Sequence, residues 1–116
     1  MLKYKLYLND ILRTIKLIEF STKNINFDKF DSDRNLIDAT CMRIQIIGES
    51  IKKIPKEIKG KYPKIDWKRF LDSRNIISHS YFAVNPMIIW TIIRDEIPIL
   101  KKHIREVLKR EIKDEK

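Results

Sequence analysis

The sequence predicts an all-α protein, an up-and-down bundle of four main helices with a kinked C-terminal helix. A chain of 116 residues fits one domain, which we place at residues 1–116. Only two glycines and four prolines interrupt it, too few for a turn-rich β-sandwich or barrel. Apolar residues recur at three- and four-residue steps, and no strand-like alternation is present.

The first helix is predicted at residues 3–22, where one apolar stripe consists of Tyr4, Leu8, Ile11, Leu12, Ile15 and Ile18. The run Ser21-Thr22-Lys23-Asn24 contains several poor helix formers and should end this helix. Phe27 and Phe30 follow in a segment with room for one helical turn.

A second helix is predicted at residues 32–53, with Asp31 or Ser32 capping its first amides. Its stripe consists of Leu36, Thr40, Ile44, Ile47 and Ile51. It should end before Pro55, and Gly60 and Pro63 make the next residues a connector. A cluster of lysines surrounds this connector and consists of Lys52, Lys53, Lys56, Lys59, Lys61 and Lys64. We favour a solvated loop over an RNA-contacting patch as the interpretation of this cluster.

The third helix is predicted at residues 66–80, with Asp66 as its N-cap and with Trp67, Phe70 and Leu71 packing inward. The pair Asn85-Pro86 marks the start of the last helix, at residues 86–112. Its apolar stripe consists of Trp90, Ile93, Ile97, Leu100, Ile104 and Leu108. Pro98 lies inside this pattern, so we expect a kink there rather than a stop.

The chain is strongly basic, with 25 Lys and Arg against 16 Asp and Glu and a net charge of +9. A small protein of this charge attracts polyanions, of which nucleic acid is the commonest. A thermophile-like preference for Lys, Glu and Ile explains the same composition equally well, because the basic residues are scattered.

Cys41 is the single cysteine, which excludes an internal disulfide and a cysteine-based zinc site. We expect it to be a small buried side chain in a reducing compartment. The sequence shows no secretory signal and no apolar run of membrane-spanning length. The expectation is a soluble, cytoplasmic protein without membrane contact.

The most informative segment is Arg74-Asn75-Ile76-Ile77-Ser78-His79-Ser80-Tyr81. On a helix, Arg74, Ser78 and Tyr81 form one stripe, at steps of four and three residues. Asn75 and His79 form the neighbouring stripe. Five polar side chains therefore share one side of the helix, and such a patch requires a polar partner or a solvent-lined groove.

These residue types suit cleavage of an RNA phosphodiester. His79 titrates near neutral pH and can move a proton, and Arg74 can grip a phosphate through two hydrogen bonds. Asn75 can orient the imidazole or bind the substrate. RNA supplies its own 2′-OH as the nucleophile, so neither a metal nor a cofactor is required, and no metal-ligand constellation is present. A structural hydrogen bond between the same residues is the plainer alternative.

The segment from Arg74 to Tyr81 resembles the signature of the HepT family, a branch of the HEPN superfamily, in which an Arg is followed by four residues, a His, any residue and a Tyr. The segment Arg43-Ile44-Gln45-Ile46-Ile47-Gly48-Glu49 resembles a second stretch of the same family. Further agreements cover nearly the whole chain: Tyr62-Pro63, Trp67, Val84, Trp90, Ile97-Pro98 and Leu100.

The resemblance implies an all-helical homodimer whose Arg-His motifs face each other across a cleft. It implies a metal-independent ribonuclease, the toxin of a type VII toxin-antitoxin system, with catalytic Arg74 and His79. Its implied partner is a minimal nucleotidyltransferase antitoxin, which transfers AMP onto Tyr81. The chain departs from many relatives by having Asp72-Ser73 before the Arg, and Asp72 could pair with a nearby basic residue or weaken RNA binding. The alternatives are a non-catalytic module that binds a nucleotidyltransferase or its substrate, and a plain helical scaffold.

Overall fold

The helices follow one another in the predicted order in the computed structural model, which describes residues 3–79 and 85–114. No strand occurs in these two ranges, so the all-α prediction is confirmed. The described part contains the long helices α1 (Lys3–Thr22), α3 (Arg34–Lys53), α5 (Trp67–His79) and α7 (Ile97–Asp114). A further run leads directly into α7 and consists of α6 (Pro86–Thr91) and the π-helical turn η2 (Ile92–Glu96). The short helices are α2 (Phe27–Asp31) and α4 (Lys56–Lys61).

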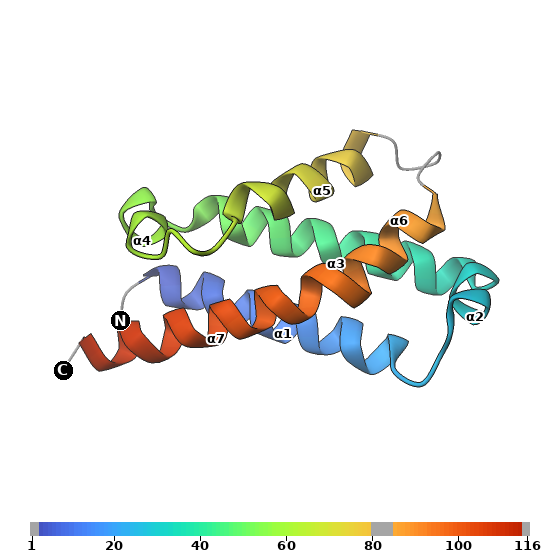
Figure 1. Ribbon diagram of the computed structural model, residues 1–116, viewed down its shortest axis with the longest axis horizontal. Coiled ribbons are helices and arrows are strands. Elements are labelled where there is room, and N and C mark those ends of the chain that lie inside the picture. Colours follow the sequence, from blue (N-terminus) through green and yellow to red (C-terminus); the bar gives the residue numbers. More distant parts are fainter. Residues whose placement is uncertain (1–2, 80–84, 115–116) are drawn as a thin grey trace.

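Helix α3 packs between α1 and α5, and α7 packs against α1 (Figure 1). The apolar stripes predicted from the sequence meet in one core, whose fully buried members include Leu8, Ile11, Ile15, Ile18, Ile44, Ile47, Ile51, Ile77 and Ile104. Complete burial of one such side chain contributes about 1.5–3 kcal/mol, so the isoleucine-rich stripes largely determine the packing. None of the helices described is long and apolar enough to cross a membrane.

The single helical turn expected around Phe27 and Phe30 is confirmed as α2. Both phenylalanine rings pack on Trp90, with ring centroids 6.2 and 5.2 Å from the indole centroid. The guanidinium of Arg94 lies 4.1 Å from the same indole ring and donates a hydrogen bond of 2.9 Å to the carbonyl oxygen of Ile25. These contacts fix α2 against the α6–η2 segment.

Two of the predicted caps are confirmed. Asp66 accepts a hydrogen bond from the backbone N–H of Arg69 at 3.0 Å, at the start of α5. Asn85 accepts one from Met87 N–H at 2.9 Å, with Pro86 in the first turn of α6. Both caps satisfy amides that lack partners within the helix, which sets where α5 and α6 begin.

The predicted start of the second helix is wrong. Asp33, not Asp31 or Ser32, is the N-cap of α3, and its carboxylate accepts from the Leu36 N–H at 3.0 Å. Asp31 is the last residue of α2, and Ser32 is its C-cap, with its N–H bonded to the Asp28 carbonyl oxygen. Three consecutive residues can cap a helix here, and the preceding turn of α2 uses the first two.

The continuation of the last helix through Pro98 is confirmed. Proline has no N–H and its ring crowds the carbonyl four residues earlier, which disturbs the α-helical pattern. The chain accommodates this in η2, directly before Pro98, where the Ile97 N–H bonds to the carbonyl oxygen of Ile92, five residues back. The helix thus passes the proline by a π-helical turn and continues as α7.

The connector after α3 contains a helix, α4, that was not predicted from the sequence. The connector is held in place by the buried carboxylate of Glu111. That carboxylate accepts hydrogen bonds from the hydroxyls of Tyr4 (2.6 Å) and Tyr62 (2.5 Å) and from Lys61 Nζ (2.9 Å). Burial raises the pKa of Glu111, but the three hydrogen bonds and the Lys61 charge outweigh it and lower the pKa to about 2. One ionised carboxylate therefore joins α1, the connector and α7.

Candidate active site

The position of the candidate active site is set by the way α5 packs against the core. Phe70 and Ile77 are buried on its inner side. Arg74 lies four residues after the first and three before the second, so its side chain starts on the same side of the helix. Only 16% of the Arg74 side chain is exposed. A cation at this depth requires compensating polar partners.

Gly48 makes room for this arginine. A Cβ atom built on Gly48 would lie 2.6 Å from Cγ of Arg74 and 3.1 Å from its Cβ and Cδ. Any larger residue at this position of α3 would collide with the stem of the arginine. The absence of a side chain lets α5 approach α3 closely, which is one of the uses of glycine inside a helix.

The guanidinium of Arg74 meets polar groups from two helices. Its Nη2 pairs with Oε1 of Glu49, which follows Gly48 on α3. Its Nη1 donates to Oδ1 of Asn75 at 2.9 Å. Its Nε is buried and has no hydrogen-bond partner among the described residues. The arginine is therefore held at the edge of the α3–α5 contact, with part of its donor set still unused.

Arg74 and Asn75, neighbours in the sequence, are in contact, because the Asn75 carboxamide oxygen accepts a hydrogen bond from the guanidinium. The predicted role of Asn75, to orient the imidazole or bind the substrate, stays a prediction. Ser78 and His79 belong to the last turn of α5, and their side chains lie outside what the structure describes. Tyr81 lies outside the described residues altogether. The roles of Ser78, His79 and Tyr81 therefore stay predictions.

The residues before Arg74 tie α5 to its surroundings. Asp72 forms an ion pair with Lys68 at 3.0 Å, which confirms the expectation that it finds a basic neighbour. The Ser73 hydroxyl donates to the Glu96 carboxylate on η2, at 3.1 and 3.3 Å. Burial raises the pKa of Glu96, while the hydrogen bond from Ser73 opposes this shift. The Asp72-Ser73 pair thus gives α5 one surface ion pair and one link to the π-helical turn.

The lysine cluster runs from the last turn of α3, where Lys52 and Lys53 follow Glu49 by about one turn, through α4 to Lys64. Helix α4 is at one end of the molecule, whereas the C-terminal end of α5 points toward the other (Figure 1). Members of the cluster have partners within the chain: Lys61 pairs with Glu111, and the Lys53 ammonium lies 5.6 Å from the ring centroid of Tyr7. The part from Lys56 to Lys61 is a helix rather than the predicted loop.

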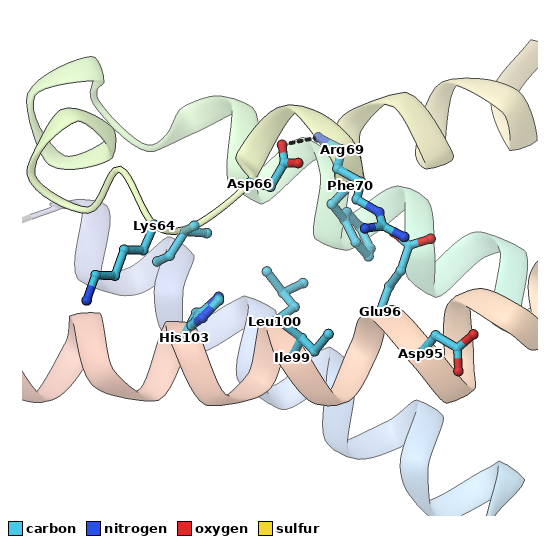
Figure 2. Close-up of a pocket in the computed structure, with 10 residues that line it drawn as sticks. Lys64, Asp66, Arg69, Phe70, Asp95, Glu96, Ile99, Leu100 and His103 are labelled. Atoms are coloured by element: carbon cyan, nitrogen blue, oxygen red, sulfur yellow. Dashed lines mark hydrogen bonds between the residues drawn. The ribbon is translucent and has the colours of Figure 1, made fainter.

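A pocket of about 160 Å³ opens between the start of α5 and α7 (Figure 2). His103, the only other histidine of the chain, lines it together with Arg69 and Glu96. Its volume is below the several hundred cubic ångströms typical of ligand pockets, and its rim mixes both signs of charge. Arg74 is not among the lining residues, so this pocket is distinct from the candidate active site.

Cys41 is the small buried side chain that the sequence predicted, with 2% of its surface exposed. Burial, assisted by the charge of Asp38, raises the pKa of its thiol to about 11. A thiol that stays protonated at neutral pH is a poor nucleophile, so Cys41 does not contribute to a covalent mechanism.

Comparisons with known proteins agree with this description. A family model described as ribonuclease HepT-like matches residues 11–107. The chain is 42% identical to a Methanocaldococcus jannaschii protein named "Gamma-glutamylcyclotransferase and putative RNase", over 90% of this chain but only 47% of that protein. It is 39% identical to a "Putative RNase" of Caldanaerobacter subterraneus, over 90% of this chain and 94% of that protein. It is 35% identical to the "Probable ribonuclease HepT" of Thermococcus cleftensis, over 91% of this chain and 96% of that protein. No match to a solved structure was found.

The helical bundle, with Arg74 anchored on α5 one turn before His79, defines an all-α domain of the HEPN-like class. More narrowly, the chain belongs to the HepT-like ribonuclease family, whose model covers most of its length. The two segments that resemble the family, around Glu49 and around Arg74, lie on α3 and α5, the two helices that meet at the candidate active site.

Proposed function

We propose that the chain is a metal-independent endoribonuclease and the toxin of a type VII toxin-antitoxin system. The observation that supports the proposal is the guanidinium of Arg74, held at the α3–α5 edge between Asn75 and Glu49, in a member of a ribonuclease family. A fixed guanidinium is the group that grips a phosphodiester through two hydrogen bonds.

In the proposed reaction the 2′-OH of RNA attacks the adjacent phosphorus while Arg74 holds the phosphate oxygens. The bond to the 5′-oxygen breaks, which leaves a 2′,3′-cyclic phosphate on one product and a 5′-OH on the other. His79 handles the protons, one removed from the 2′-OH and one delivered to the leaving 5′-oxygen. A homodimer places two copies of the motif in one cleft, so that one imidazole takes the first proton and the other supplies the second.

RNA cleavage in the presence of EDTA tests this proposal. Wild type should cut single-stranded RNA, and His79→Ala should lose about a hundredfold or more of the rate while keeping its helical content. His103→Ala removes the only other histidine, which lies outside the candidate site, and should cut like wild type. Loss of cleavage on addition of EDTA, or normal cleavage by His79→Ala, would reject the mechanism.

The proposed homodimer has its own test. Size-exclusion chromatography with light-scattering detection should give twice the mass of one chain at micromolar concentration. Excess His79→Ala chains should suppress the activity of wild-type chains, because each mixed dimer then holds only one of the two imidazoles that the proposed reaction uses. A monomer that cleaves RNA would contradict the composite active site.

Tyr81 is the proposed control point, modified with AMP by a minimal nucleotidyltransferase antitoxin. An added phosphate beside Arg74 would compete with the RNA phosphate and block the cleft. After incubation with that enzyme and ATP, Tyr81→Phe should keep its mass and its cleavage activity. Tyr7→Phe, a control that leaves Tyr81 in place, should gain one AMP as wild type does. An AMP-sized mass gain on Tyr81→Phe would place the control point elsewhere.

A second candidate function is a non-catalytic module that binds a nucleotidyltransferase or its substrate. The observation that favours it is the pairing of Arg74 with Glu49, which takes up part of the guanidinium. If the chain is such a binding module, wild type should bind RNA or the nucleotidyltransferase but leave RNA uncut. The cleavage assay with and without EDTA therefore separates the two functions.

A further inference from the structure

The Glu49 carboxylate lies where an anionic ligand of Arg74 would lie. It comes from α3, one residue after the glycine on which the stem of Arg74 packs, and it contacts Nη2 of the guanidinium. The Glu49 side chain is 49% exposed, whereas that of Arg74 is 16% exposed. The guanidinium is thus largely enclosed by protein, and Glu49 is on its solvent side.

A carboxylate and a phosphate use the same donors of an arginine. Both present two oxygens to the planar guanidinium and form parallel, charge-assisted hydrogen bonds. With Nη1 bonded to Asn75 and Nε buried, Nη2 is the terminal nitrogen that contacts the carboxylate. An RNA phosphate that binds Nη2 of Arg74 must therefore replace Glu49 or share that nitrogen with it, against the repulsion of a second negative charge.

We propose that Glu49 occupies the phosphate-binding position of Arg74 in the free protein and leaves it when a nucleic-acid phosphate binds. The inference rests on the proposed function only in assigning the incoming phosphate to RNA. In the free protein Glu49 is a positioning residue, because it supplies a counter-charge to a mostly enclosed cation. Its half-exposed side chain can return to water when it is displaced. Phosphate binding thus exchanges one ion pair for another, which weakens the hold on any single phosphate.

The test is the salt dependence of binding to a fluorescent single-stranded DNA oligonucleotide, which lacks the 2′-OH and stays intact. Glu49→Gln keeps the shape of the side chain but removes its charge, so one further phosphate can be neutralised. Each neutralised phosphate on a single strand adds about 0.7 to the slope of log affinity against log salt. Glu49→Gln should steepen the slope by about that amount and bind about fivefold more tightly at 0.1 M salt.

Three variants isolate the effect. Glu57→Gln makes the same chemical change on exposed α4, away from Arg74, and should keep the wild-type slope. Glu49→Asp retains the charge and should also keep it. In an Arg74→Ala background, Glu49→Gln should leave the slope unchanged, because no guanidinium remains to be released. Thermal unfolding of each variant confirms that the fold is retained.

Steeper salt dependence confined to Glu49→Gln with Arg74 present supports the inference. A slope equal to that of Glu57→Gln, or weaker binding than wild type, overturns it. The result is separable from the proposed function. If wild type cuts RNA but Glu49→Gln binds DNA as wild type does, the proposed role of Glu49 is rejected and the ribonuclease proposal is retained. If wild type leaves RNA uncut but Glu49→Gln binds more tightly, the role of Glu49 stands and the ribonuclease proposal falls.

Discussion

Replacing Gly48 with alanine should have two opposing effects on the free energy of unfolding. Alanine in a helix interior is favoured over glycine by about 1 kcal/mol. The added Cβ would meet Cγ of Arg74 at 2.6 Å, whereas ordinary carbon contacts are about 3.5–4.0 Å, so the arginine must move by about 1 Å. Overpacking of this kind costs about 1–3 kcal/mol. The net loss of stability should therefore be small, between about 0 and 2 kcal/mol.

The loss of activity should be far larger than the loss of stability. A misplacement of about 1 Å in a group that holds the substrate can cost about a hundredfold in rate. We expect Gly48→Ala to unfold within a few degrees of wild type while its kcat/KM for RNA falls by about that factor. Thermal unfolding followed by circular dichroism and initial rates of RNA cleavage measure the two quantities on the same preparations.

The only other glycine of the chain provides the matched control. A Cβ on Gly60 would meet no atom within 4 Å, so Gly60→Ala should raise the unfolding temperature slightly and leave cleavage unchanged. A double-mutant cycle isolates the collision, because in an Arg74→Ala background Gly48→Ala should no longer be destabilising. The expected coupling is about 1 kcal/mol or more. Gly48→Ala that cleaves like Gly60→Ala and shows no coupling to Arg74 would refute this reasoning.

Two further predictions concern buried titratable groups. The lowered pKa of Glu111 means that its ionised form is favoured in the folded state, so this stabilisation is complete above pH 4.5 and is lost as the pH falls toward 2. Wild type should lose about 3 kcal/mol more than Glu111→Gln between these limits, measured by urea unfolding; parallel curves would contradict it. The raised pKa of Cys41 predicts that iodoacetamide at pH 8 labels the unfolded chain but not the folded one, and rapid labelling of the folded chain would show an accessible thiolate.

The long helices were predictable because their apolar stripes are regular. The first helix has its predicted limits, residues 3–22, since every member of its stripe faces the core and no cap competes for its start. The start of α3 was not predictable, because Asp31, Ser32 and Asp33 can each cap a helix and the choice depends on where α2 ends. Helix α4 was not predicted, because Gly60 and Pro63 indicate a turn; the structure nevertheless forms a helix of six residues that includes the glycine and ends before the proline.

The candidate site was predictable in its residue types but not in its contacts. Arg74 and Asn75 lie in one short segment, and the sequence alone marks them as a polar patch on a helix. The contact between Arg74 and Glu49 spans 25 positions and exists only because α3 and α5 pack together. A local signal was present, since Gly48 is an isolated glycine inside the predicted helix at residues 32–53, and such a glycine often reflects close packing. The sequence does not say which side chain fills the space.

One substitution in the substrate tests whether the 2′-OH of RNA is the nucleophile on which Arg74 and His79 act without a metal. An RNA oligonucleotide is first cut by wild type in EDTA, and its cleavage position and end groups are determined by mass spectrometry. The same oligonucleotide is then prepared with a single 2′-deoxy nucleotide on the 5′ side of that position. We expect a 2′,3′-cyclic phosphate on the product of the first substrate and no cut at the modified position of the second. Cleavage that persists at the 2′-deoxy position would contradict it.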